Sequence, residues 1–448
     1  MELASGPLQW DPQIMGESAA EILKHGFGEF RSFVNPLIAE RARLAREPIE
    51  FVRVVDGVLR DASGTAYEDL HGTQMLGHRN PAVADAIRGF LDSDIPNWFP
   101  SRVNPWAGRL ARRLCERTGY TNVFFGMSGA DAVEAALKLA RAATRKPRII
   151  ALTGGYHGCT YGAVALMHDG PLHDPFGPHL PGVEKVPFDD VDALAAALAP
   201  GDVAAVVVEP IQGEGGVRPL SAAMIDALCE LTARHGALLV ADEVQTALGR
   251  SGRFLASSAW PRRPDVALIA KTLGGGLVPI SAMLAQRETF ERAYGQNFFI
   301  GESHNTTFGY NGLTCVAALA TLDLLDDALI DSVDRRGTAF RTQLTESLTG
   351  NPLFHEVRGS GFMIGVELVH TPHPWLSFEH FGMPELAHMP TVGPLLCYRL
   401  YARGFFAFVC GHDWRVLRLQ PRFDIPDQKL ADLARACREE LDHLANLS

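Results

Sequence analysis

Two short apolar runs, Ala237 to Ala241 and Val266 to Ala270, are each followed directly by a charged residue, Asp242 and Lys271. Runs of this length that are apolar throughout are typical of parallel strands buried on both faces. In open α/β sheets of such strands, ligands bind beyond the carboxyl ends of the strands. We therefore expect Asp242 and Lys271 to leave neighbouring strands and to face one crevice.

An acid and an amine in one crevice suit a particular chemistry. A lysine can form an imine with an aldehyde, and an aspartate can keep a pyridine nitrogen protonated, which is the pairing that pyridoxal phosphate needs. The chain has only six lysines among its 41 lysines and arginines, so a merely solvating lysine after an apolar strand is less expected. The segment LLVADE also resembles the magnesium-binding strand of P-loop ATPases, but those need GxxxxGK[ST], and no Gly-Lys pair occurs in the chain. We therefore interpret Lys271 as a chemical residue.

Composition limits the kinds of protein that this chain can be. Its 448 residues allow two or three domains, and a hydrophobic content of 47% supplies a large core. A formal charge of −11 without a basic stripe argues against a nucleic-acid partner. The seven cysteines have no CxxC spacing, which indicates neither a disulfide framework nor a zinc site. The N-terminus has no signal-peptide pattern and no apolar stretch of about 18 residues occurs, so we expect a cytoplasmic protein without a membrane partner.

The order of the elements predicts two domains. From Thr121 onward, apolar strands alternate with alanine-rich helices, which is typical of a parallel sheet covered on both faces. Before it, the segment FVRVVDGVLRDASGTAYEDL predicts β-hairpins. Near Arg335 the pattern changes to helices and short strands. We therefore predict a large α/β domain over residues 66–335 and a smaller α+β domain built from residues 1–65 and 336–448.

Two segments carry candidate residues for holding a phosphorylated ring. Ser128 and Asp131 form a capping-box pattern before an alanine-rich helix, and Gly129 lets a ligand approach the backbone. Free amides at such a helix start can bind a phosphate, although most capping boxes are only caps. The turn TGGYHGCTYG would display Tyr156 and His157 at its tip, where an aromatic ring could stack on a planar cofactor.

Other residues are open to more than one interpretation. Glu209 and Glu214 follow a buried strand, so they need cations or hydrogen-bond donors nearby. Trp98 lies in an aromatic loop that either covers a hydrophobic surface or lines a substrate pocket, with equal support for each. Thr307 is either a helix cap or a donor to an anion. The histidines of residues 371–394 match no metal-ligand pattern, so no metal site is predicted.

Six motifs together resemble the class III, ω-amino-acid type, of pyridoxal-phosphate-dependent aminotransferases. They occur in that family's order and spacing: SGADAVEAALKLAR, GGYHG, VVVEPIQGEGG, LLVADEVQTALGRSGRF, IAKTLGGG and NTTFG. The resemblance covers roughly residues 50 to 430. It implies the type I aminotransferase fold, an α/β fold with a large, mostly parallel sheet domain and a smaller α+β domain. It also implies a homodimer with shared active sites at the subunit interface.

The resemblance implies roles for individual residues around pyridoxal 5′-phosphate. Lys271 resembles the Schiff-base lysine, which also acts as general acid and base, and Asp242 resembles the partner of the pyridinium nitrogen. Glu209 resembles a carboxylate near the cofactor ring. The remaining cofactor contacts are Ser128, Gly129 and Ala130 at the phosphate, Tyr156 and His157 at the ring, Gln245 at the phenolic oxygen, and Thr307 donated to the phosphate by the other subunit.

The implied reaction moves an amino group between a primary amine or ω-amino acid and a 2-oxo acid, either 2-oxoglutarate or pyruvate. Trp98, Glu214 and Arg418 are the candidate substrate-binding residues. The Arg418 guanidinium suits a substrate carboxylate, and Glu214 could neutralise it when an amine without a carboxylate binds. A fixed salt bridge between these two residues is the alternative. An aminomutase or amino-acid epimerase on the same scaffold, and a non-catalytic homologue, are the alternative functions.

Overall fold

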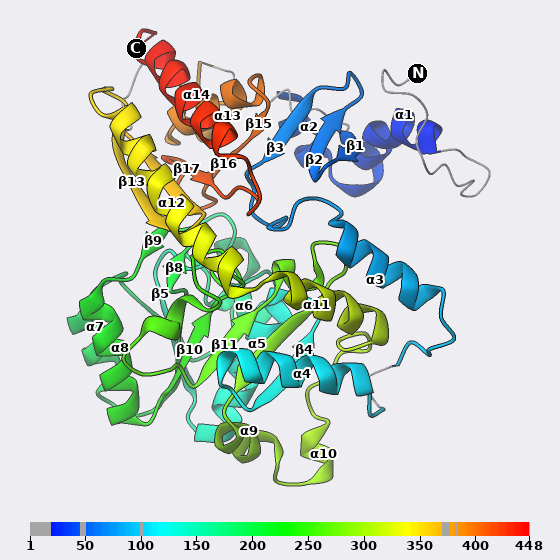
Figure 1. Cartoon of the computed structure of the whole chain (residues 1–448). Helices are drawn as coiled ribbons and strands as arrows, with labels where there is room; N and C mark the ends of the chain where they lie inside the picture. Colours follow the sequence, from blue (N-terminus) through cyan, green and yellow to red (C-terminus); the bar gives the residue numbers. More distant parts are fainter. Residues whose placement is uncertain (1–18, 45–50, 99–101, 370–376, 381–382, 448) are drawn as a thin grey trace.

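A seven-stranded sheet forms the centre of the large domain (Figure 1). The computed structural model describes residues 19–44, 51–98, 102–369, 377–380 and 383–447. The strand order is β4-β12-β11-β10-β7-β5-β6; β12 runs antiparallel to its neighbours, and the other pairs are parallel. The bounds of these strands are β4 Asn122–Gly126, β5 Arg148–Leu152, β6 Val183–Val186, β7 Val203–Val208, β10 Leu238–Asp242, β11 Val266–Ile269 and β12 Ser281–Ala285.

Alternate residues of the central strands bury opposite faces of this sheet. In β7, Ala205 and Val207 belong to the core under helix α5, whereas Val206 and Val208 belong to the core under helices α7 and α8. Because successive side chains of a strand point to opposite faces, a strand covered on both sides must be apolar at every position. The mostly parallel α/β sheet that the apolar runs predict is confirmed.

Helices surround this sheet. The capping box predicted at Ser128 and Asp131 is confirmed at the start of α5. The helices of this part of the chain are α3 Pro81–Leu91, α4 Pro105–Thr118, α5 Gly129–Thr144, α6 Tyr161–Ala165, α7 Val191–Leu198, α8 Ala222–His235, α9 Arg287–Tyr294, α10 Phe298–Gly301 and α11 Gly312–Leu324. Short 3-10 helices are η2 Asp174–Phe176, η3 Ala256–Ala259 and η4 Lys271–Gly274, and β8 Ile211–Gln212 pairs with β9 Arg218–Pro219.

A second unit, above the first in Figure 1, holds two four-stranded sheets. One has the order β13-β14-β17-β16, and the other joins β1, β2 and β3 to β15 from the far end of the chain. The hairpins predicted before residue 70 are confirmed, because β2 pairs antiparallel with both β1 and β3. The strands are β1 Phe51–Val55, β2 Val58–Asp61, β3 Ala66–Asp69, β13 Phe354–Ser360, β14 Met363–Leu368, β15 Phe405–Phe406, β16 Phe408–Val409 and β17 Val416–Leu419. The helices are α12 Asp327–Leu348, α13 Val392–Tyr401, α14 Asp427–Ala445 and the 3-10 helix η5 Pro384–Leu386.

The long helix α12 leads from the large sheet to the second unit (Figure 1). The boundary predicted between residues 335 and 336 falls inside this helix, and the one predicted between residues 65 and 66 falls directly before β3. The two ends of the chain meet in one sheet, where Phe405 of β15 pairs with Glu68 of β3. The division into domains at those two positions stays a prediction.

The N-terminal described segment is helical, with α1 Ala19–Glu29, a π-helix Phe30–Val34 and α2 Pro36–Leu44. Within the described part of the chain, no helix is both long enough and apolar enough to cross a membrane.

The topology brings Asp242 and Lys271 to the same edge of the large sheet. Asp242 is the last residue of β10 and pairs with Leu268 of the parallel neighbour β11, and Lys271 comes shortly after the end of β11. Parallel neighbours end at the same edge, so both side chains lie where ligands of such sheets bind. The expectation that these residues leave neighbouring strands is confirmed.

Candidate active site

A cavity of about 430 Å³ opens beyond the carboxyl ends of β10 and β11, and we call it the strand-end cavity. Its lining contains every residue predicted for the site except Trp98, Thr307 and Arg418. The lining residues are Ser128, Gly129, Ala130, Tyr156, His157, Gly158, Cys159, Thr160, Glu209, Glu214, Asp242, Val244, Gln245 and Lys271. Five separate stretches of the chain therefore converge on one hollow.

Lys271 lies in a backbone conformation that is uncommon for a residue with a side chain. Its φ of 49° falls in the left-handed region, at the first residue of η4. Such conformations cost free energy and persist where the surrounding fold imposes them, often at functional sites. Burial lowers the pKa of the Lys271 ammonium group, while the negative charges of Asp242 and Glu214 act in the opposite direction.

The Asp242 carboxylate is held by a buried histidine. His157 Nδ1 and Asp242 Oδ2 are 2.7 Å apart, and the amide of Val244 donates to Asp242 Oδ1 over 3.1 Å. Burial alone would lower the pKa of His157, but the hydrogen bond and the charge of Asp242 outweigh it, so the pKa is raised. The sequence analysis predicted that His157, like Tyr156, contacts the cofactor ring. In the structure its imidazole holds Asp242 in place.

Glu209 connects two loops of the cavity. Its Oε1 accepts from the amide of Tyr156 over 2.9 Å, and its Oε2 accepts from the amide of Gly213 over 3.0 Å. The donors that the sequence required for this buried carboxylate are thus backbone amides. Burial raises the pKa of Glu209 to about 7, and Asp242 adds to the increase, whereas His157 and both amides act against it. Glu209 therefore fixes the loop that carries Tyr156 to the loop that precedes Glu214.

The start of helix α5 presents a cradle for a phosphate. Ser128 Oγ and Asp131 Oδ2 satisfy other amides of the cap, whereas Gly129 and Ala130 are the first two residues of the helix and their amides have no intrahelical acceptor. A Cβ at Gly158, which has a φ of 120°, would lie 2.6 Å from the Cβ of Ala130. Glycine there lets the loop approach the helix start closely, and amides without an acceptor at a helix start are the groups that bind phosphates.

Gln245, which also lines the strand-end cavity, has a buried oxygen, Oε1, without a hydrogen-bond donor among the described residues. A buried acceptor without a donor is costly, so a ligand with a hydroxyl group fits beside it. The lysine, the aspartate, the free amides at the helix start and this acceptor together fit pyridoxal 5′-phosphate, which offers an aldehyde, a ring nitrogen, a phosphate and a phenolic oxygen.

Arg418 lies behind the cavity wall, where it meets Glu214. Its Nη1 donates to Glu214 Oε1, and the amide of Gly411 donates to Glu214 Oε2 over 2.8 Å. Arg418 is 4% exposed. Burial alone would raise the pKa of Glu214, but the charge of Arg418 and the Gly411 amide lower it below its usual range. In this conformation the two residues form the ion pair that the sequence raised as one alternative.

Trp98 and Thr307 lie elsewhere in the single chain. Trp98 is half-buried and Thr307 is exposed in a turn, and neither lines the strand-end cavity. Asn97, next to Trp98, accepts from the amide of Leu313 at the start of α11 over 3.1 Å. This part of the chain therefore lies against α11, and a role of either residue in the site stays a prediction.

The sequence analysis did not predict several residues of this region, among them Cys159 and His412. Cys159 lines the cavity, and its Sγ lies 3.3 Å from the Tyr156 hydroxyl. His412 comes from the second unit, and its ring centre lies 6.0 Å from that of Tyr156. Burial lowers the pKa of His412 to about 4, so it is neutral at physiological pH. Cys159 could have been predicted as a site residue because it lies three positions after Tyr156 in the same turn. No local sequence pattern predicts that His412 lies near the site.

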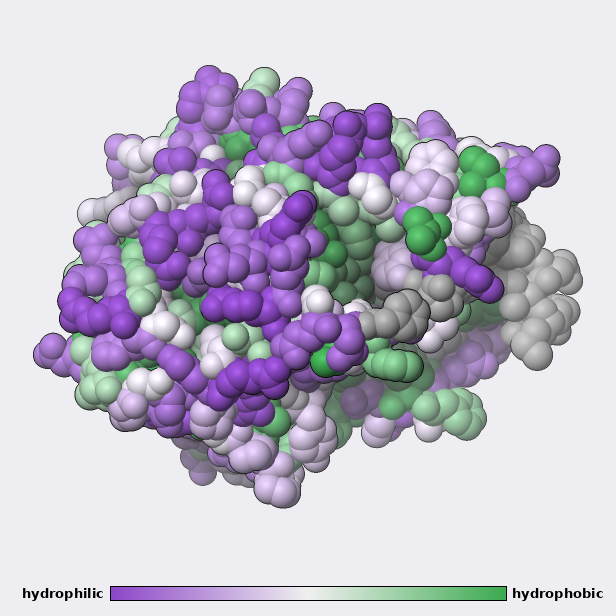
Figure 2. All heavy atoms as spheres, turned by 90° about the horizontal axis from the view of Figure 1, so that it is seen from below, coloured by the Kyte–Doolittle hydropathy of each residue, from purple (hydrophilic) through white to green (hydrophobic). Residues whose placement is uncertain are grey.

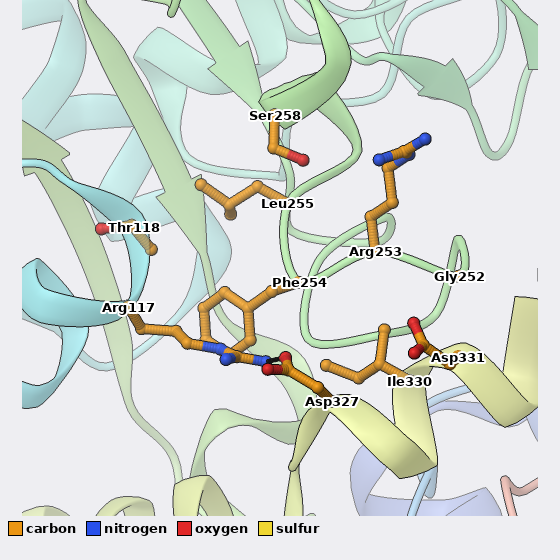
Figure 3. Close-up of a pocket in the computed structure, with 10 residues that line it drawn as sticks. All are labelled: Arg117, Thr118, Gly252, Arg253, Phe254, Leu255, Ser258, Asp327, Ile330 and Asp331. Carbon is orange, nitrogen blue, oxygen red and sulfur yellow. Dashed lines mark hydrogen bonds and ion pairs between the residues drawn. The ribbon is translucent and has the colours of Figure 1, made fainter.

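A second cavity, of about 260 Å³, lies beside α4 and α12 (Figure 3). Arg117 and Asp327 point toward each other there and form an ion pair, and the Arg117 guanidinium lies 5.2 Å from the centre of the Phe254 ring. Within the described residues, no side chain predicted for the cofactor site lines this cavity. The reactive groups gather in the strand-end cavity instead.

Comparison with known proteins agrees with this geometry. The sequence profile of the family described as aminotransferase class-III matches residues 42–440. Aminotransferase PigE of a Serratia species is 31% identical over 453 residues, which cover 92% of this chain and 53% of PigE, so the chain spans about half of that relative. Acetylornithine aminotransferase of Corynebacterium efficiens is 40% identical over 333 residues, covering 72% of this chain and 80% of the relative.

A solved structure extends the comparison to the fold. Ornithine aminotransferase of Toxoplasma gondii, in which PLP partially occupies the active site, has a TM-score of 0.81 with 27% identity and covers 96% of this chain and 100% of its own. The shared fold, the family match over most of the chain and the groups around the strand-end cavity agree. The chain belongs to the class-III aminotransferases and is a pyridoxal 5′-phosphate-dependent transaminase of fold type I.

Proposed function

We propose that this aminotransferase moves an amino group between a primary amine or ω-amino acid and a 2-oxo acid, 2-oxoglutarate or pyruvate. The observation that carries the proposal is that Lys271 and Glu214 line one cavity while Arg418 is bonded to Glu214 behind its wall. A lysine can transfer protons, and an arginine released from its carboxylate can bind the carboxylate of a substrate. The relatives named for acetylornithine and ornithine support an amino-acid substrate.

Lys271 is the residue to which we assign the proton transfer. Its lowered pKa increases the fraction of neutral amine near pH 7, so Nζ can take a proton from the substrate carbon and return one later. Bound pyridoxal 5′-phosphate supplies a ring that takes up the electron pair released in that step. Asp242, oriented by His157, places a negative charge beside the ring nitrogen and keeps it protonated.

The other cavity residues hold the cofactor in this proposal. The free amides of Gly129 and Ala130 bind its phosphate next to the Ser128 cap, Tyr156 lies against its ring, and Gln245 contacts its phenolic oxygen. Glu209 supports these contacts because its carboxylate accepts hydrogen bonds from the backbone amides of Tyr156 and Gly213. These groups line the strand-end cavity, which supports the assignment.

Glu214 and Arg418 allow one site to accept two unlike substrates. While they are paired, Glu214 neutralises the charge of Arg418, and the site suits an amine that lacks a carboxylate at this position. When an acid substrate binds, Glu214 swings away and Arg418 pairs with the substrate carboxylate. Leaving a buried guanidinium unpaired would be costly, so one of the two partners must always be present.

The working form that we propose is a homodimer in the cytoplasm, in which Thr307 reaches the phosphate of the neighbouring subunit and Trp98 the substrate. Large apolar side chains on the surface support an interface, among them Val103 at 92% exposure and Phe299 at 84%. The face in Figure 2 is hollowed, with hydrophobic side chains inside the hollow. All seven cysteines are free, which suits a reducing compartment.

Cofactor attachment tests the role of Lys271. Borohydride reduction of the purified holoenzyme should attach the cofactor to Lys271, as read by peptide mapping, and Lys271→Ala should lose both the label and transamination. Lys429→Ala removes an exposed lysine and serves as the control. Labelling of any of the other five lysines would overturn the assignment.

Separate half-reactions test the role of Arg418. Arg418→Ala should slow the half-reaction with glutamate or 2-oxoglutarate by an amount equivalent to about 3–5 kcal/mol, the cost of stripping a partner from a buried charge. The half-reaction with a carboxylate-free amine should be spared. Stopped-flow absorbance of the cofactor measures both. Arg415→Ala is the matched control. It removes an arginine that is paired with Asp413 and directly precedes β17, the strand that carries Arg418. Equal losses in both half-reactions would make Arg418 a structural residue.

The raised pKa of Glu209 predicts a pH dependence of stability. The folded protein holds a proton on Glu209 up to about pH 7, whereas the unfolded chain releases it near the usual 4.5. The resulting stabilisation is fully present below pH 4.5 and is lost as the pH rises through 7, by up to about 3 kcal/mol. Denaturant unfolding of the cofactor-free protein should show this loss relative to Glu209→Gln. Glu346→Gln, at an exposed position, controls for the loss of a carboxylate. A difference that does not change with pH would contradict the prediction.

Dilution tests the shared site. If Thr307 completes the neighbour's phosphate site, cofactor release and dissociation into monomers should occur together, because cofactor binding then stabilises the dimer. Light scattering combined with cofactor absorbance follows both events. A monomer that retains its cofactor would show that the site is complete within one chain.

A further inference from the structure

The segment that follows β10 carries two residues that we assign to the cofactor ring. Asp242 ends the strand, and Gln245 lies three positions further along the chain. Between them, the amide of Val244 donates to Asp242 Oδ1 over 3.1 Å. All three residues line the strand-end cavity. The position of Val244 therefore bears directly on the carboxylate that we assign to the ring nitrogen.

Gly129 leaves the space that Val244 occupies. A Cβ at Gly129 would lie 2.9 Å from Val244 Cγ1 and 3.2 Å from Cγ2. Gly129 is the first residue of α5, and its φ is not in the left-handed region, so the backbone conformation does not require glycine. Alanine is the better helix former at such a position. The glycine is explained instead by its close approach to Val244, whose branched side chain cannot easily turn aside.

Gly213 leaves space for the side-chain amide of Gln245 in the same way. A Cβ at Gly213 would lie 1.5 Å from Gln245 Oε1 and 2.5 Å from Cδ, so the amide could not stay in its position. The φ of Gly213 is also outside the left-handed region. The N–H of Gly213 donates to Glu209 Oε2 over 3.0 Å, and its oxygen accepts from the amide of Val217 over 3.2 Å. Gln245 therefore rests against a backbone that is held on both sides.

Contact, rather than hydrogen bonding, limits where the oxygen of the Gln245 amide can lie. Within the part of the chain that the structure describes, Oε1 has no hydrogen-bond partner, and the Gly213 backbone lies directly beside it. We propose that Gly129 and Gly213 are positioning residues that fix the segment after β10 by close contact at two points. The inference rests on the proposed function, in which Asp242 and Gln245 meet the cofactor ring. It adds the two groups that hold these contacts in place.

Gly213→Ala tests the contact with Gln245. The added carbon should turn the amide away without unfolding the protein, because the glutamine side chain is long and unbranched. The variant should then behave as Gln245→Ala does. In both variants, the pH midpoint of the cofactor's absorbance change should move in the same direction by about 1 to 2 units, the effect expected of one hydrogen bond to an ionisable group. The double variant should show no further shift.

Absorbance titration of these holoenzymes separates the inference from the proposed function. If Gln245→Ala does not move the midpoint, the contact with the phenolic oxygen in the proposed function is wrong, and the role of Gly213 falls with it. If Gln245→Ala moves the midpoint and Gly213→Ala does not, only the role of Gly213 is wrong. Gly108→Ala is the matched control, because an added Cβ at this glycine of α4 would meet open space and should leave the midpoint unchanged.

Gly129→Ala tests the contact with Val244. The added carbon should displace Val244 and the amide that holds Asp242, so the affinity for pyridoxal 5′-phosphate should fall by about 10- to 100-fold, as expected for overpacking a close contact. In the Val244→Ala background, which lacks both Cγ atoms, the same change should have little effect. Calorimetric titration of the four cofactor-free proteins with pyridoxal 5′-phosphate measures this. An equal loss in both backgrounds would overturn the role of Gly129, because an effect on the phosphate amides alone does not depend on Val244.

Discussion

The buried guanidinium of Arg250 joins the large sheet to the second unit. Arg250 is 0% exposed and donates to the backbone oxygens of Gly72, Phe362 and Pro421, which come from distant parts of the chain. Burial lowers its pKa to about 9. Taking a charge out of water is costly unless hydrogen bonds compensate, and here three carbonyl oxygens do so. The same three oxygens would lose their donor if the two units separated, so the contact resists relative movement.

The active site depends on that junction because its parts come from both units. Asp242 ends a strand shortly before the loop that carries Arg250, and Arg418 lies on the strand just before Pro421. The contact of Arg250 with Pro421 thus holds Arg418 at a constant position relative to the strand-end cavity. Within the cavity, Glu209 fixes its loops by accepting from backbone amides. In the proposed function, the side chain of Glu214 is the part that moves within this frame.

The sequence was sufficient to predict structure where it depends on contacts between near neighbours or on a regular pattern of apolar residues. Apolar residues at every position of the central strands required burial on both faces, and this placed Asp242 and Lys271 at one edge of a parallel sheet. The N-terminal cap of α5 could be predicted because Ser128 and Asp131 interact within one helical turn. The resemblance of six motifs identified the family and its cofactor, and residues of five of those motifs line the strand-end cavity.

Tertiary structure alone decided which partners these residues meet. His157 and Asp242 are 85 positions apart, and Glu214 lies 197 positions from Gly411 and 204 from Arg418. No periodicity links such positions. The contact of His157 with Asp242 depends on the strand order of the large sheet, and the contacts of Glu214 depend on how the two units pack against each other. The backbone donors to Glu209 and Glu214 carry no side-chain signature at all. The sequence thus determined which chemical groups the site contains, whereas the order of the strands and the packing of the two units determined which group each of them touches.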